Sequence, residues 1–147
     1  MPVKLVLAAF AASVSVASAA AVPIVVHRDA GCGCCEKWAA QVRQQFGRRV
    51  SIIDDQQRAA FQRAHGVPAR LSSCHTAIVD GMVFEGHVPI ADMKRVLAQR
   101  PRGVSGLAVT GMPVGSPGME VPGQRGQSFN VIAFGRGREI VFARHSG

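Results

Sequence analysis

The chain has 147 residues, of which 48% are hydrophobic and 18% are charged. That length and apolar content are enough for the core of one domain, which excludes a wholly disordered protein. Basic residues outnumber acidic ones by 17 to 9, giving a formal charge of +8. The basic residues are scattered and only 5% of the chain is aromatic, so we expect no nucleic-acid partner.

The first segment has the order of a secretory signal peptide. Lys4 supplies a positive charge, residues 5–16 are almost wholly apolar, and Ala17-Ser18-Ala19 fits a small-residue cleavage site. We expect cleavage after residue 19, or as late as residue 21. The apolar stretch is shorter than the ~20 residues of a spanning helix, so we expect no stable membrane span after processing. An uncleaved membrane anchor is the alternative. The signal predicts export to the bacterial periplasm. The length of the remaining chain predicts a single domain over residues 22–147.

The rest of the chain alternates between strand and helix patterns. Short apolar runs predict strands at 23–28, 50–53, 75–79 and 82–85, with Asp80-Gly81 as a hairpin turn between the last two. Spaced apolar residues predict helices from Cys35 to residue 46, over 56–65, and from Pro89, as first helical residue, to just before Pro101. This order predicts an α/β fold with a thioredoxin-like mixed sheet flanked by helices.

A region rich in Gly, Pro and Met follows, over residues 101–127. Its apolar residues follow neither the helix nor the strand period, so we expect one long loop. Loops of this length usually have a function or act as linkers. Two strand patterns then flank Gly135-Arg136-Gly137, at 129–134 and 139–143. These predict an added C-terminal β-hairpin.

The chemistry is concentrated in four cysteines. Cys32, Cys34 and Cys35 lie where the first strand meets the first helix, and Cys74 directly precedes the third strand. In a thioredoxin-like fold these two places face each other, so we expect the four to meet. Thiolates are stabilised at a helix N-terminus, and clustered soft sulfur selects Cu(I), zinc or an iron–sulfur cluster. The crowded C-x-C-C spacing lacks the second pair usual for zinc and the wider spacing usual for iron–sulfur ligands, so it favours Cu(I).

Two other interpretations use the same cysteines. Cys32 and Cys35 form a C-x-x-C pair, which is the spacing of a thiol–disulfide oxidoreductase. Cys34 stands inside that pair and would be a wrong partner for exchange. The third interpretation is two structural disulfides, since the number of cysteines is even and the expected compartment is oxidising.

Four further side chains are weaker candidates for binding metal or orienting a ligand. His75 follows Cys74, and His87 lies at a turn before a helix. Met112 and Met119 lie in the Gly/Pro/Met-rich loop, and exported thioethers can bind Cu(I). Each has a plainer alternative, because a histidine can simply pack in a strand and a loop methionine can simply fill a gap.

These motifs resemble a known family. Gly31-Cys32-Gly33-Cys34-Cys35-x-x-Trp38, Cys74-His75-Thr76, Glu85-Gly86-His87-Val88-Pro89 and the stretch from Gly106 to Met119 are similar to the CopG-type copper-resistance proteins. The resemblance implies a thioredoxin-like fold, a periplasmic location, copper binding through Cys32, Cys34, Cys35 and Cys74, and a role in copper or heavy-metal resistance. It further implies interconversion of Cu(I) and Cu(II), which would make the protein a copper oxidoreductase. Copper ions and other periplasmic copper-handling proteins are the implied partners.

The same motifs depart from true thioredoxins. His75 stands at the entry to the third strand, where thioredoxins have a cis-proline. This difference argues against disulfide exchange as the main activity.

Overall fold

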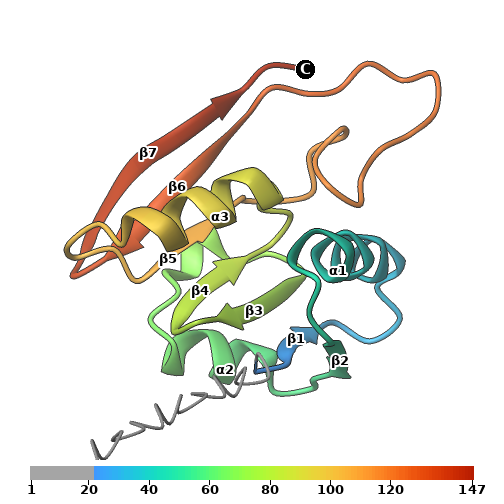
Figure 1. Cartoon of the computed structure of the whole chain (residues 1–147). Helices are drawn as coiled ribbons and strands as arrows, with labels where there is room; N and C mark the ends of the chain where they lie inside the picture. Colours follow the sequence, from blue (N-terminus) through green and yellow to red (C-terminus); the bar gives the residue numbers. More distant parts are fainter. Residues whose placement is uncertain (1–21) are drawn as a thin grey trace, which may run out of the picture.

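The computed structural model describes residues 22–147, so the proposed signal peptide and its cleavage sites lie outside the described residues. Within that range the chain forms a mixed seven-stranded sheet with helices on both faces, which confirms the α/β prediction. The strand order is β2-β1-β3-β4-β5-β6-β7 (Figure 1). The elements are β1 Ile24–Arg28, α1 Gly33–Phe46, β2 Val50–Asp54, α2 Arg58–Ala64, the 3₁₀ turn η1 Ala69–Leu71, β3 His75–Val79, β4 Met82–Glu85, α3 Ile90–Gln99, β5 Gly106–Ala108, β6 Phe129–Gly135 and β7 Arg138–His145.

The pairing of β1 positions the cysteines. β1 runs parallel to β2, with α1 as the crossover helix, and antiparallel to β3. Arg28 at the end of β1 therefore faces His75 at the start of β3. The hairpin between β3 and β4 turns at Asp80-Gly81, as predicted. The start of α1 and the start of β3 thus lie at the same edge of the sheet.

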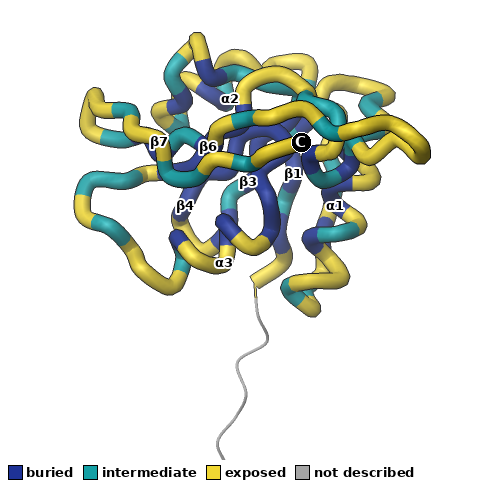
Figure 2. The backbone as a smooth tube through the Cα atoms, turned by 90° about the horizontal axis from the view of Figure 1, so that it is seen from above, coloured by how far each residue is buried: buried dark blue, intermediate teal, exposed yellow. Residues whose placement is uncertain are grey.

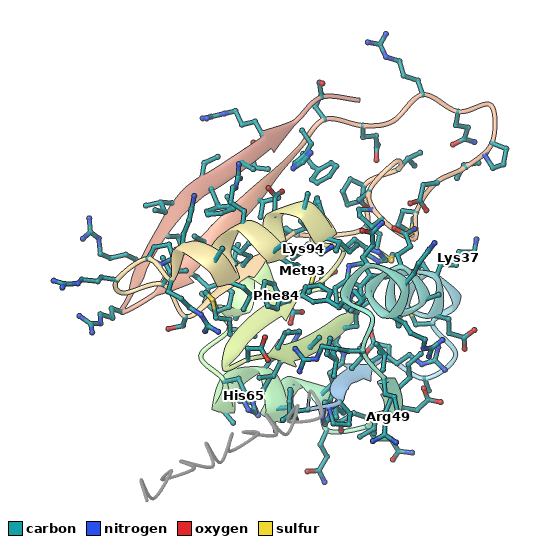
Figure 3. All side chains as sticks on the ribbon, in the orientation of Figure 1. Lys37, Arg49, His65, Phe84, Met93 and Lys94 are labelled. Carbon is teal, nitrogen blue, oxygen red and sulfur yellow. A yellow bond between two sulfur atoms is a disulfide. The ribbon has the colours of Figure 1, made fainter. Side chains whose placement is uncertain are left out.

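Two groups of buried side chains cover the two faces of the sheet. Alternate residues of a strand point to opposite faces, and Phe84 of β4 belongs to one group while Val83 belongs to the other. The larger group includes Trp38 of α1 and Met93 of α3, and Figure 3 shows Met93 and Phe84 between α3 and the strands. The smaller group lies with η1 on the opposite face. Figure 2 shows the strands β1, β3 and β4 as the buried centre of the molecule.

Some element boundaries differ from the prediction. α1 begins at Gly33 rather than Cys35, because the Cys32 side chain caps the helix by accepting a hydrogen bond from the Cys35 backbone amide. Pro89 precedes α3 instead of being its first helical residue, since its ψ of 134° is extended. α2 is shorter than the predicted 56–65.

The prediction of one loop over residues 101–127 was wrong in its first part. Residues 106–108 form β5, which pairs parallel with β4 and antiparallel with β6. A Cβ at Gly106 would collide with the Val83 carbonyl oxygen and lie 2.6 Å from the Phe134 ring, so the close strand pairing needs glycine here. A strand of three residues is too short to show a period. The long loop therefore covers residues 109–128 and leads into the β6–β7 hairpin, which was predicted.

No helix among residues 22–147 has the length and apolar character required to cross a membrane.

Candidate metal centre

The four cysteine sulfurs meet at one point of the molecule. Cys32, Cys34 and Cys35 lie at the N-terminus of α1, and Cys74 lies directly before β3. The backbone amide of Asp29 donates to the Cys74 carbonyl at 3.0 Å, which ties the two segments together. The four Sγ atoms lie within 4.8 Å of one another. The structure therefore brings together the residues that the sequence predicted to converge.

The four sulfurs form a compact cluster that contains a disulfide. Cys32 and Cys35 are joined by a disulfide, while Cys34 and Cys74 are free thiols. Cys34 Sγ lies 3.3 Å from Cys32 Sγ, and Cys74 Sγ lies 3.4 Å from Cys35 Sγ. The structure thus differs from the interpretation of two structural disulfides. The joined pair is the one that the oxidoreductase interpretation uses.

Hydrogen-bond donors hold the segment that carries Cys32. The Cys35 backbone amide donates to Cys32 Sγ at 3.3 Å, at the positive end of the α1 dipole. The Arg28 guanidinium donates to the Cys32 carbonyl at 2.9 Å and forms an ion pair with Glu36 at 2.8 Å. Arg28 therefore fixes the loop that carries Cys32, and the Cys35 amide favours negative charge on the Cys32 sulfur when the disulfide is reduced.

Cys74 has the opposite electrostatic setting. Burial and the nearby charge of Cys34 raise the pKa of Cys74 to about 12. Without metal this thiol therefore holds its proton at neutral pH. A metal ion must displace the proton to bind the sulfur, so affinity should fall as the pH falls.

Two buried histidines lie against Cys74. His87 Nε2 is 3.2 Å and His75 Nδ1 is 3.5 Å from Cys74 Sγ. Both side chains have no exposed surface. Burial lowers the pKa of each histidine, so both are neutral imidazoles, the form that binds metals. The structure places both weaker histidine candidates at the cluster.

The loop over residues 109–128 covers the outer side of the cluster. Met112 Sδ lies 3.8 Å from Cys34 Sγ, and the Met112 side chain is half exposed. A Cβ at Gly118 would lie 2.6 Å from the Cys34 carbonyl oxygen, so glycine lets this loop sit directly on the start of α1. Met119 forms backbone hydrogen bonds with Gly115 and Ser116. Among the described contacts, only the first of the two methionines reaches a cysteine.

Sequence reasoning missed a buried acid that holds the Cys74 segment. Glu85 accepts hydrogen bonds from the Ser73 backbone amide at 2.6 Å, from Gln62 Nε2 at 2.6 Å and from the Thr76 hydroxyl at 2.5 Å. The carboxyl group has no exposed surface. The available signal was an acidic residue directly at the end of the apolar run of β4, because a buried acid needs hydrogen-bond partners.

The two methionines allow a matched comparison. For the Cu(I) site that the sequence predicts, we expect Met112→Leu to weaken binding by about tenfold, in the range seen when a supporting contact of a metal site is lost. Met119→Leu should leave the affinity unchanged, because that side chain makes no described contact with the cysteines. The swap nearly conserves volume, so each variant should lose less than ~1.5 kcal/mol of stability. Competition against a Cu(I) chelator and thermal melts of the metal-free proteins measure the two effects. If the two variants bound Cu(I) with equal affinity, Met112 would have no part in metal binding.

Comparisons with known proteins agree with this site. Two solved structures, named Copper resistance protein copG Form 1 and Form 2, are each 40% identical to this chain. Form 1 matches with a TM-score of 0.78 over 86% of this chain and 99% of its own. Form 2 matches with a TM-score of 0.75 over 84% and 97%. Residues 71–119 match the family described as "Protein of unknown function, DUF411", a range that includes Cys74, both buried histidines and both loop methionines. No curated protein matched the chain.

Proposed function

This chain belongs to the CopG family of copper resistance proteins, and from that premise we propose that it binds Cu(I) through Cys32, Cys34, Cys35 and Cys74. The observation that carries the proposal is the convergence of four sulfurs within 4.8 Å of one another. Thiolate is a soft ligand, which suits Cu(I) better than it suits hard ions. The thioredoxin-like arrangement expected from the sequence is part of the same proposal, since it presents the sulfurs at the start of a helix.

The disulfide suggests how the site could interconvert Cu(I) and Cu(II). When Cys32 and Cys35 are reduced, all four sulfurs are available to the metal. Oxidation of these two thiolates to the disulfide releases two electrons, which reduce two Cu(II) ions to two Cu(I) ions. The reverse reaction restores both thiolates. We propose this exchange as the basis of a copper oxidoreductase activity, supported by the disulfide lying directly beside two free thiols.

Copper binding by the fully reduced protein is the direct test. The chain from residue 22 onward is reduced under anaerobic conditions, loaded with Cu(I), desalted and analysed for metal and thiols. We expect at least one equivalent of copper, and much weaker retention after the Cys32–Cys35 disulfide has formed, because two of the four thiolates are then lost. Zinc in place of copper, or no retained metal in the reduced state, would contradict the proposal.

Thiol–disulfide exchange is the second candidate function. It is favoured by one observation, the disulfide between Cys32 and Cys35 at the N-terminus of α1, where a leaving thiolate is stabilised. The two functions separate in an insulin reduction assay. An exchanger needs only Cys32 and Cys35, so Cys34→Ser would retain full activity. Such activity, together with copper binding unaffected by Cys34→Ser, would favour exchange over copper handling.

Export is also part of the proposal. We expect protein recovered from a bacterial periplasm to begin at residue 20, or as late as residue 22, as measured by intact-mass spectrometry. The periplasm does not keep thiols reduced as cytosolic glutathione does, so bound Cu(I) would protect the cysteines from oxidation. Recovery of an intact Met1–Ala19 segment in the membrane fraction would contradict this expectation. Other periplasmic copper-handling proteins are the partners that this location offers.

A further inference from the structure

A second set of metal-ligand atoms lies on the buried side of the cysteine cluster. The sulfur of Cys74 and one ring nitrogen from each of His75 and His87 lie within 4.8 Å of one another. None of the three belongs to the Cys32–Cys35 disulfide. This set therefore stays complete in the oxidised protein, where the four-cysteine cluster has lost two of its thiolates.

The hydrogen bonding of His87 fixes which of its nitrogens is free to bind. Nδ1 lies 2.8 Å from the Pro117 carbonyl oxygen, and a carbonyl can only accept. Nδ1 must therefore carry the proton, which leaves the lone pair on Nε2, directed at Cys74 Sγ 3.2 Å away. A ring N–H donated to a backbone carbonyl is the usual way in which proteins orient a metal-binding histidine.

His75 is buried without an ordinary structural role. Its Nδ1 faces Cys74 Sγ at 3.5 Å, whereas its Nε2 is buried with no hydrogen-bond partner. Leaving a buried polar atom unpaired is costly and unusual in a folded protein. Trp38 packs against one side of the imidazole at 4.4 Å between ring centres, and the His87 ring lies edge-on at 5.0 Å. The His75 ring is thus held in place beside Cys74 Sγ. An apolar side chain would fill the same space without leaving a polar atom unpaired.

The chemistry of this set differs from that of the four cysteines. One thiolate and two neutral imidazoles suit divalent transition-metal ions that are neither very hard nor very soft. Among the first-row divalent ions, Cu(II) generally forms the most stable complexes with such ligands. We propose that Cys74, His75 and His87 form a second metal site, for a divalent transition-metal ion such as Cu(II), that persists while Cys32 and Cys35 are joined. The proposal does not depend on Cu(I) binding by the four cysteines, although Cys74 is common to both sets.

One consequence is that the disulfide changes the kind of ligand the protein offers. In the reduced state the four sulfurs form a soft site. In the oxidised state the complete site is the mixed one formed by Cys74, His75 and His87. The shared sulfur would let the two ligand sets compete for one ion.

Co(II) is the probe for this site, because it does not oxidise thiols and its bonds to thiolate give a charge-transfer absorption. The protein is prepared with the Cys32–Cys35 disulfide intact, confirmed by mass spectrometry, and titrated without oxygen. We expect one equivalent of Co(II) to bind and to produce the thiolate charge-transfer band together with visible d–d bands.

Variants assign the ligands. Cys74→Ser should abolish the charge-transfer band, and His75→Ala and His87→Ala should each weaken Co(II) binding at least tenfold. Cys34→Ser removes the other free thiol and is the matched control, so it should bind as the parent does. His65→Ala is the histidine control, since His65 bonds the Phe61 carbonyl on α2. Thermal melts of the metal-free variants check folding. Should the alanine variants unfold, His75→Gln and His87→Gln keep side chains of similar size and should show the same losses.

The double variant Cys32→Ser/Cys35→Ser provides an independent arm, because it lacks the disulfide and half of the cysteine cluster in any redox condition. It should retain the Co(II) spectrum. A spectrum that depends on Cys34, that ignores both histidine variants, or that appears only after the disulfide is reduced would overturn the proposal. Cu(I) binding by the reduced parent is measured separately. Its absence beside an intact Co(II) spectrum would refute the proposed function and leave the second site standing.

Discussion

Cys34→Ser should weaken Cu(I) binding by the reduced protein by about 100-fold or more. Serine replaces a thiolate with a hydroxyl, which is a hard and poorly ionised ligand. Loss of a residue that only supports a metal ligand already lowers metal affinity about 10- to 100-fold. Loss of the ligand itself should lower the affinity further. Competition with a Cu(I) chelator under anaerobic conditions measures the change. Cys74→Ser should have a similar effect, because Cys74 Sγ belongs to the same cluster and lies 3.4 Å from Cys35 Sγ.

Ser73→Ala is the matched control for the Cys74 segment. The Ser73 hydroxyl lies 2.9 Å from the Gly111 carbonyl oxygen and 3.9 Å from Cys74 Sγ, but it adds no thiolate to the cluster. It should therefore change Cu(I) affinity far less than either cysteine variant. If copper affinity instead depended only on Cys32 and Cys35, those two residues would be the whole metal site. The role proposed for Cys34 and Cys74 would then be wrong.

The convergence of the four cysteines was predictable from the sequence because it depends on the order of strands and helices along the chain. A strand, a helix start and a later strand in an α/β order place Cys35 and Cys74 at the same sheet edge, although 39 residues separate them. Asp80-Gly81 predicted the hairpin that sets the register of β3 and β4. Both inferences need only local patterns and the general rules for connecting strands.

The features that were missed depend on contacts between distant segments. β5 is three residues long and is recognised only by its pairing with β4 and β6. Nothing in the spacing of Met112 and Met119 shows that the first lies beside Cys34 and the second does not. The orientation of His87 likewise depends on the Pro117 carbonyl, thirty residues further along the chain. Such contacts are fixed by tertiary packing, which a single sequence does not reveal.

Glu85→Ala should lower the free energy of unfolding by about 3 kcal/mol or more, since buried donors would lose a charged partner. The Ser73 amide, the Gln62 amide and the Thr76 hydroxyl all donate to this carboxyl group. Cu(I) affinity should also fall, because Ser73 directly precedes Cys74. Urea unfolding measures the stability change. Glu139→Ala is the control, because Glu139 pairs with an exposed Arg70 and should lose less than about 1 kcal/mol. Similar losses in both variants would show that the Glu85 network does not stabilise this part of the fold.

The same residue gives stability a pH dependence with a definite sign. Burial raises the pKa of Glu85 above its ordinary value of 4.5, so the folded protein holds this proton to a higher pH than the unfolded chain does. The contribution of Glu85 is therefore most favourable below pH 4.5, declines as the pH rises through the raised pKa, and is constant above it. Asp55 acts in the opposite direction, because its hydrogen bond from His27 lowers its pKa.

Glu85→Gln isolates this effect, because glutamine has the same size and no titration. Subtracting the variant's unfolding free energy from the parent's at each pH removes the contribution of Asp55, which both proteins share. The free energy of unfolding of the parent minus that of the variant should fall as the pH rises from about 4.5 through the raised pKa of Glu85. Above that pKa the difference should be constant. A difference that stays constant across this range would mean that Glu85 is ionised alike in the folded and unfolded states. In that case the donors around the carboxyl group, rather than its burial, would control its charge.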